Sequence, residues 1–183
     1  MATHVLDTFD LRTVARPELE QLSSRANEVV HLCVRDENQV VYIDKVESDQ
    51  TITMRSKIGR RSMLHCTAVG KVILAWLDKR ELQAIIAETG LPRYTEQTIT
   101  SFEQLEEELK TIRTKQFAID NIEHEEGIRC IAAPVFDYHS EVVGTISVAG
   151  PEARMTLERI EGELKAMLLT SASVISRQLG YER

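Results

Sequence analysis

Apolar residues recur every three or four positions near both ends of the chain, which predicts an amphipathic helix over residues 6–25 and another over 155–179. Pro17 interrupts the first pattern, and a proline inside a helix removes a hydrogen bond, so we expect two helical pieces that meet near Arg16. Three more helical patterns occupy the middle of the chain, at 66–77, at 81–88 and from Ser101 onward. The last opens with a capping box, in which the Ser101 hydroxyl accepts one free backbone N–H and the Gln104 side chain reaches back to another.

Segments rich in β-branched residues, or with alternating apolar positions, lie between these helices. We expect six strands, at residues 29–35, 39–47, 51–55, 117–123, 128–136 and 142–149, with a basic, glycine-containing loop at 56–64. With period two, Cys130 and Ala132 point to one face of the sheet while Ile131 and Ala133 point to the other, so both faces are mostly covered. The fold class is therefore α+β, an antiparallel sheet of about six strands with helices packed on it, of the GAF or PAS (profilin-like) type.

Composition narrows the class of protein. The 183 residues are 43% hydrophobic and 28% charged, which suits one compact domain with an ordinary core. A net charge of −7 opposes binding to nucleic acid, because no long Lys/Arg cluster offsets it. Three widely spaced cysteines, the lack of an export signal and the short apolar runs together predict a cytoplasmic protein that does not enter a membrane.

Polar groups that stand among apolar ones mark the candidate site. His65, Cys66 and Thr67 precede the mostly apolar helix, and a helix start presents unpaired N–H groups. The amides of Thr67, Ala68, Val69 and Gly70 are therefore candidates for holding a carboxylate or a phosphate. The alternative is that Cys66 or Thr67 only caps the helix, and that the small residues let it approach the sheet.

An acidic run at residues 120–126 ends one of the expected strands. Most of it is expected to be a solvated turn, because alternation places its members on both faces. Asp120 is the exception, since it lies inside the strand, where a buried carboxylate needs a ligand hydroxyl or a backbone donor. The backbone donor is the simpler alternative, and both stay open.

Two other kinds of site are weighed and not favoured. Cys66 or Cys130 would be a nucleophile with His65 or His124 as base, but no cysteine-enzyme signature surrounds either thiol. The same four residues lack zinc-ligand spacing, so we expect neither a cysteine- or metal-dependent hydrolase nor a cofactor. Trp76 suits a core and Ser147 a satisfied buried hydroxyl. A purely structural oligomerisation module, with no cavity near Ala68, is the remaining alternative.

Three ordered segments then carry a family resemblance: GRRSMLHCTAVGKVILAWL, DNIEHEEGIRCIAAPVFD and GTISVAGP. They resemble the carboxy-terminal effector-binding domain of IclR-family transcriptional regulators over roughly residues 11–180. Within the family, TEQTIT, EEGIRCIA and QLGY are similar to segments of regulators of sugar-acid catabolism, the 2-keto-3-deoxygluconate regulators.

The resemblance implies a division of the protein and its partners. Residues 1–25 would be the end of an interdomain linker and the first helix, and 26–183 the ligand-sensing domain; the amino-terminal winged helix-turn-helix is expected to be absent from this chain. Such proteins form dimers or tetramers that repress or activate operons according to a bound metabolite, and they reach DNA through the missing domain. They are not enzymes, and their partner here would be a small carboxylated metabolite, a sugar acid or a keto acid.

The resemblance also implies the effector-binding residues, which come from the helix start and the facing strands. They are Met54, Ala68, Val69, Gly70, Asp120, Ile128, Cys130, Ser147 and Ala149. Ala68 replaces a glycine, and Ala149 a serine, of the pattern that binds glyoxylate and pyruvate. One hydroxyl is lost and bulk is added, which disfavours those two acids as ligands.

Overall fold

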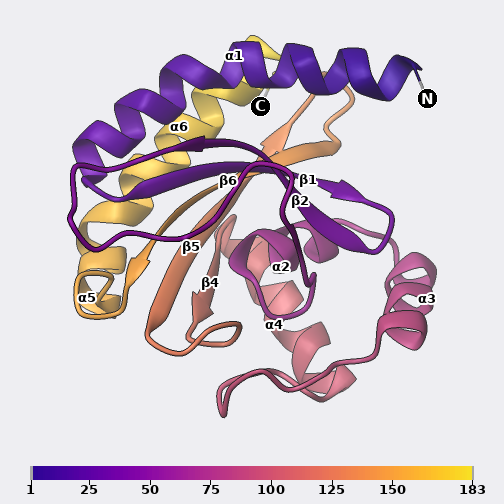
Figure 1. Cartoon of the computed structure of the whole chain (residues 1–183). Coiled ribbons are helices and arrows are strands. Elements are labelled where there is room, and N and C mark those ends of the chain that lie inside the picture. Colours follow the sequence, from indigo (N-terminus) through magenta and orange to yellow (C-terminus); the bar gives the residue numbers. More distant parts are fainter. Residues whose placement is uncertain (1, 183) are drawn as a thin grey trace.

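Within residues 2–182, which the computed structural model describes (side chains from residue 10 onward), six strands form one antiparallel sheet in the order β3-β2-β1-β6-β5-β4 (Figure 1). The strands are β1 (Val29–Asp36), β2 (Gln39–Val46), β3 (Arg61–Ser62), β4 (Ala118–Asn121), β5 (Ile128–Phe136) and β6 (Val142–Pro151). The helices are α1 (Ala2–Ala26), α2 (Ala68–Ala75), α3 (Lys79–Thr89), α4 (Phe102–Lys115), α5 (Leu157–Arg159), the π-helical η1 (Ile160–Leu164) and α6 (Lys165–Gln178). The predicted α+β class is confirmed.

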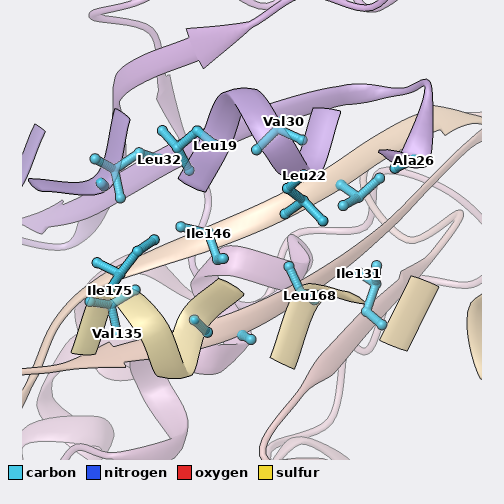
Figure 2. Packing of buried hydrophobic residues seen from close by; sticks show 14 of the residues in the cluster. Leu19, Leu22, Ala26, Val30, Leu32, Ile131, Val135, Ile146, Leu168 and Ile175 are labelled. Carbon is cyan, nitrogen blue, oxygen red and sulfur yellow. The ribbon is translucent and has the colours of Figure 1, made fainter. Parts of the chain in front are cut away.

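Helices α1 and α6 cover one face of the sheet and bury the larger of its two cores (Figure 2). Leucines of both helices meet the aliphatic side chains that alternation directs to this face of β1, β5 and β6. The side chains labelled in Figure 2 are Leu19, Leu22, Ala26, Val30, Leu32, Ile131, Val135, Ile146, Leu168 and Ile175. Each fully buried leucine or isoleucine stabilises the fold by about 1.5–3 kcal/mol, so this layer fixes the sheet on which the second layer rests.

Helix α1 runs without interruption through Pro17, so the predicted break near Arg16 is wrong. An interior proline costs about 3 kcal/mol, but Ala15 and Leu19 on either side of it are fully buried against the sheet. Arg16 adds a hydrogen bond of 2.9 Å from its guanidinium to Asp44 of β2. Packing on both sides of the proline therefore holds one helix. The side chains at positions 6 and 9, part of the predicted pattern, lie outside those described.

The predicted third strand at 51–55 is also wrong, because residues 47–60 form an irregular segment, named here loop 47–60. Side chains bond its carbonyls where a neighbouring strand would otherwise do so. The Lys45 ammonium donates to the carbonyls of Met54 (3.0 Å) and Ser56 (2.9 Å), and Arg154 donates to the carbonyl of Ile52 (2.9 Å). The third strand is instead β3, which is two residues long and lies inside the segment 56–64 that was predicted as a loop. It pairs with Val40 and Val41 of β2.

Helices α2, α3 and α4 cover the opposite face. Every residue of α2 is buried, as its apolar composition predicts. Asp78 caps α3, and the Ser101 hydroxyl caps α4 by accepting the Gln104 N–H at 3.4 Å, which confirms the first half of the capping box. The Ser101 hydroxyl also donates to Glu103 at 2.8 Å. Helix α2 thus lies directly on the sheet, and α4 packs behind it.

The expected carboxy-terminal helix begins at Leu157 rather than 155, after Thr156 accepts the amide of Arg159. One π-helical turn, η1, widens it, and Ile160 and Leu164 within this turn both face the core. Between residues 2 and 182 no helix combines the length and the apolarity that a bilayer crossing needs.

Gly70 marks the closest approach of α2 to the segment before it. A Cβ built on Gly70 would lie 2.3 Å from the carbonyl oxygen of Leu64, whereas one built on Gly162 would meet nothing within 4 Å. We therefore expect Gly70→Ala to lower the free energy of unfolding by about 2 kcal/mol or more, through overpacking against backbone. Gly162→Ala is the matched control, and should raise it by up to about 1 kcal/mol. Urea unfolding of both variants measures this; equal effects would contradict the assigned contact.

Candidate ligand-binding site

A cavity of about 30 Å³ lies on the α2 side of the sheet. It is bounded by the start of α2, by loop 47–60, by the turn after β4 and by strands β1, β2, β4, β5 and β6. Its lining residues are His31, Tyr42, Met54, Thr67, Ala68, Val69, Asp120, His124, Glu125, Ile128, Cys130, Ser147 and Ala149. This volume holds about two water molecules. The oligomerisation alternative required no cavity near Ala68, so it is not favoured.

The structure brings the sequence-predicted site residues together. Eight of the nine line the cavity: Met54, Ala68, Val69, Asp120, Ile128, Cys130, Ser147 and Ala149. Gly70 does not line it, because it faces the Leu64 backbone and its amide already donates to the Thr67 hydroxyl at 3.1 Å. The role of these residues in binding a ligand stays a prediction.

Thr67 is the N-cap of α2. Its hydroxyl accepts the Gly70 amide and donates to the carbonyl of Met63 at 2.7 Å, so the capping interpretation is correct for Thr67. The cap takes the third amide of the helix. The amides of Ala68 and Val69 have no carbonyl partner within the helix, as in any first turn, and both residues line the cavity. Capping and anion binding are therefore compatible here.

Asp120 is only 3% exposed and lines the cavity. Its Oδ1 atom accepts the amide of Glu123 at 2.7 Å, so the carboxylate does bond a loop backbone, as the simpler reading proposed. It faces the cavity as well, so the two readings coexist. Burial raises the pKa of Asp120 to about 7, although the Glu123 amide alone would lower it. Near neutral pH the group is present in both protonation states.

Two threonines hold the turn that follows Asp120. Thr95 donates to the carbonyl of Ile122 at 2.6 Å, and Thr98 donates to the carbonyl of Glu123 at 2.7 Å. Ile122 has a positive φ of 61°, a left-handed conformation that an isoleucine adopts only where its surroundings impose it. These bonds fix where the strand ends and where Asp120 points.

A buried lysine behind the cavity was not predicted. The Lys71 ammonium of α2 is 2.7 Å from Glu123, 3.0 Å from Glu108 of α4 and 2.7 Å from the carbonyl of Ile119. Burial alone would lower the pKa of Lys71, but the two glutamates raise it, so the ammonium stays charged. A signal was available in the sequence, because a single lysine within a helix predicted to be largely buried needs a charged partner.

His31 and Tyr42 also line the cavity and were missed. His31 of β1 is 2% exposed, with its Nε2 atom 2.6 Å from the Ser56 hydroxyl and its Nδ1 atom 3.4 Å from that of Ser147. The ring meets Tyr42 edge-on, at 5.0 Å between centroids. Alternation along β1 was an available signal, because it places His31 on the same face as Cys33.

The thiols do not resemble an enzyme site. His124 lies 3.5 Å from the Cys66 sulfur and 3.2 Å from the Ser62 hydroxyl. Burial raises the pKa of Cys66 to about 12 and lowers that of His124, so neither a thiolate nor an imidazolium forms near neutral pH. No three metal-binding side chains converge in the part of the chain that the structure describes.

The sequence pattern of the family described as "Bacterial transcriptional regulator IclR C-terminal" matches residues 3–177. A curated relative is the HTH-type transcriptional regulator KdgR of Escherichia coli, which is 42% identical over 181 residues, 99% of this chain and 68% of the relative. The chain therefore spans about two thirds of that regulator's length.

Solved structures of regulators of this kind share the fold of this chain. The IclR protein of Thermotoga maritima has a TM-score of 0.90 at 40% identity, over 97% of this chain and 71% of that one. The inducer-binding domain of the PobR transcription factor from Acinetobacter, solved as a double mutant in complex with 3-hydroxybenzoic acid, has a TM-score of 0.84 at 25% identity, over 90% of this chain and 96% of that one.

The raised pKa of Asp120 predicts a dependence of stability on pH. Its folded value of about 7 lies above the ordinary 3.8, so its contribution to stability is complete below about pH 4 and is lost as the pH rises through 7. Asp120→Asn keeps an acceptor for the Glu123 amide and does not titrate. The difference in free energy of unfolding between this variant and the unchanged protein should shift by about 2–4 kcal/mol in favour of the variant as the pH rises from 4 to 8. Urea unfolding across this range tests it, and parallel pH curves for the two proteins would refute the assignment.

Proposed function

The chain belongs to the IclR family of bacterial transcriptional regulators, of which it is the effector-binding domain, and we propose that its effector is a sugar acid of the 2-keto-3-deoxygluconate type. The observation that carries the proposal is the cavity, which combines free amides at a helix start with a buried, partly protonated aspartate. The relatives of this chain are transcriptional regulators and not enzymes. The raised pKa of the Cys66 thiol agrees with a role other than catalysis.

One end of the cavity suits a carboxylate. None of the described residues that line it is a lysine or an arginine, so an acid cannot be held by an ion pair with the lining. The amides of Ala68 and Val69 provide the alternative, because a helix start carries roughly half a positive charge. Asp120 in its protonated form donates a hydrogen bond to the carboxylate or to the adjacent keto oxygen. The Acinetobacter relative, solved with an aromatic hydroxy acid, supports a carboxylated effector.

The rest of the lining suits a short carbon chain with hydroxyl groups. Ile128, Cys130 and Met54 offer apolar contact, while Ser147 and His31 offer hydrogen bonds. Ala68 fills space that a glycine would leave open, and Ala149 offers a methyl group where a serine would offer a hydroxyl. Glyoxylate and pyruvate lack hydroxyls on the chain, and they would leave the serine and histidine without a ligand partner.

Binding requires the cavity to enlarge, because about 30 Å³ is far less than a six-carbon acid occupies. An effector that binds the enlarged arrangement better shifts the population towards it. In the complete regulator, α1 continues the linker from an amino-terminal winged helix-turn-helix, and the shift changes DNA affinity in a cytoplasmic homodimer or tetramer that controls catabolic genes. The coupling is the difference in effector affinity between the two arrangements.

A thermal-shift comparison tests the effector class. We expect 2-keto-3-deoxygluconate at a hundredfold excess over its Kd to raise Tm by about 5–10 °C, since it adds about 2.7 kcal/mol to the folded state. Glyoxylate and pyruvate should give much smaller shifts at the same concentration. Asp120→Ala, which removes the carboxyl, should lose most of the response. The proposal fails if the sugar acid leaves Tm unchanged.

Effector affinity should depend on pH through Asp120. The anionic effector raises the pKa of the aspartate further, so binding takes up a proton and affinity increases as the pH falls from 8 to 6, by up to about tenfold per unit. The other titratable groups near Asp120 are Lys71, Cys66, Glu123, His124, Glu125 and Cys130.

Calorimetry in two buffers of different ionisation enthalpy measures the proton uptake directly. Asp120→Asn, which leaves those neighbours in place, serves as the control and should bind with a much flatter pH profile. Affinity of the unchanged protein that does not vary over this range would be evidence against a protonated Asp120 in the complex.

A further inference from the structure

His31 is a buried polar side chain that the anion-binding end of the cavity does not use. Burial, and then the positive charges of Lys45 and Arg60, lower the pKa of His31 to about 3, so the ring is neutral. A neutral imidazole cannot form an ion pair with the effector carboxylate. Its place in the lining, against Ser147 and Tyr42, instead suits an uncharged polar group.

Both ring nitrogens of His31 have partners in the closed arrangement, the one found here with the cavity of about 30 Å³. A neutral imidazole has one donor and one acceptor, and the hydroxyls of Ser56 and Ser147 serve one each. The bond to Ser56 is the short one, 2.6 Å against 3.4 Å, and it joins the cavity wall to loop 47–60. The same loop contributes Met54 to the lining, so it must move if the cavity enlarges in that direction.

Only some ligand groups can take the place of Ser56. A hydroxyl can donate or accept, so it satisfies the free ring nitrogen in either tautomer. A keto or carboxylate oxygen can only accept, and an apolar chain can do neither. Loss of Ser56 to an apolar chain would leave a buried nitrogen unpaired in either tautomer, and loss to an acceptor-only oxygen would do so in the tautomer whose Nε2 carries no hydrogen, which is costly. The site therefore discriminates between hydroxylated and plain chains at this nitrogen.

We propose that His31 determines specificity by binding a hydroxyl on the carbon chain of the effector, and that this hydroxyl replaces Ser56 and releases loop 47–60. The proposal rests on the proposed function, because it assumes a hydroxylated acid in this cavity. It adds a residue that the family resemblance did not supply, and a link between effector chemistry and loop position.

Two acids of equal length separate the role of His31 from that of the anion end. 2-Keto-3-deoxygluconate carries chain hydroxyls, whereas 2-oxohexanoate has the same six carbons and keto acid group without them. By calorimetry, His31→Leu should weaken binding of the first by about tenfold and change the second by less than about twofold. His31→Gln, which restores a donor and an acceptor, should recover most of the loss.

Ser56→Ala gives an effect of opposite sign. Without the serine hydroxyl, the effector no longer competes for His31, so affinity for 2-keto-3-deoxygluconate should rise a few-fold. The loop carries exposed trypsin sites at Arg55, Lys57 and Arg60. The sugar acid should speed tryptic cleavage there in the unchanged protein and in His31→Gln, but not in His31→Leu.

The outcomes separate the two proposals. If the unchanged protein binds neither acid, the proposed function fails and this inference fails with it. If it binds the sugar acid but His31→Leu binds both acids as before, or loses both equally, only the assignment of His31 is overturned. Weaker binding by Ser56→Ala, or loop cleavage that the effector slows, would equally overturn it, and these readouts do not depend on the folding of the His31 variants.

Discussion

The buried ammonium of Lys71 ties together the elements that build the cavity. It comes from α2, and it bonds Glu108 of α4, the carbonyl of Ile119 on β4 and Glu123 in the turn that follows. A charge in this position is tolerated only because it is paired, since an isolated buried ion costs several kcal/mol. The bond to Glu123 holds the turn whose amide orients Asp120. The same ammonium anchors α2, whose first two residues line the cavity, so one ion-pair cluster positions both groups of the anion end.

The cavity is polar at two places for different physical reasons. At the α2 start the positive potential belongs to the backbone, and burial keeps the neighbouring Asp120 carboxyl partly protonated, so that it can donate a hydrogen bond. On β1 the imidazole is uncharged, because burial and nearby cations disfavour its protonated form. A lysine or arginine in the lining would favour any anion. The arrangement found here favours a ligand with one acid group at one end and neutral polar groups elsewhere. Fewer metabolites meet that description than carry a negative charge.

The fold class and most of the lining could be predicted because they follow local periodicity. Alternation groups Cys130 with Ala132 on β5 and Ser147 with Ala149 on β6, and the pairing of the two strands puts both groups on one face. Polar residues before the apolar segment marked the start of α2. His31 and Tyr42 were missed because they come from β1 and β2, which the strand order brings beside β6 and β5, although alternation along β1 was an available signal for His31. Lys71 was missed because its partners Glu108 and Glu123 come from segments distant in the sequence. The strand expected at 51–55 was wrong for a similar reason. Composition favoured a strand, and the ammonium of Lys45, eleven residues before Ser56, decides otherwise by bonding two carbonyls of the loop.

The contacts that hold loop 47–60 determine how much of the free energy of effector binding is used to open the cavity. Contacts of Lys45, His31 and Arg154 hold it, and each hydrogen bond contributes about 0.5–1.5 kcal/mol net, so the closed arrangement is favoured by a few kcal/mol. Apparent affinity equals the intrinsic affinity multiplied by the fraction of molecules that are open. A ligand that formed only anion contacts, available in both arrangements, would not shift the equilibrium. Signalling therefore requires contacts that exist only when the loop has moved. Ser56 occupies one such position in the closed form, and for this reason the group that displaces it, rather than the carboxylate, couples effector identity to conformation.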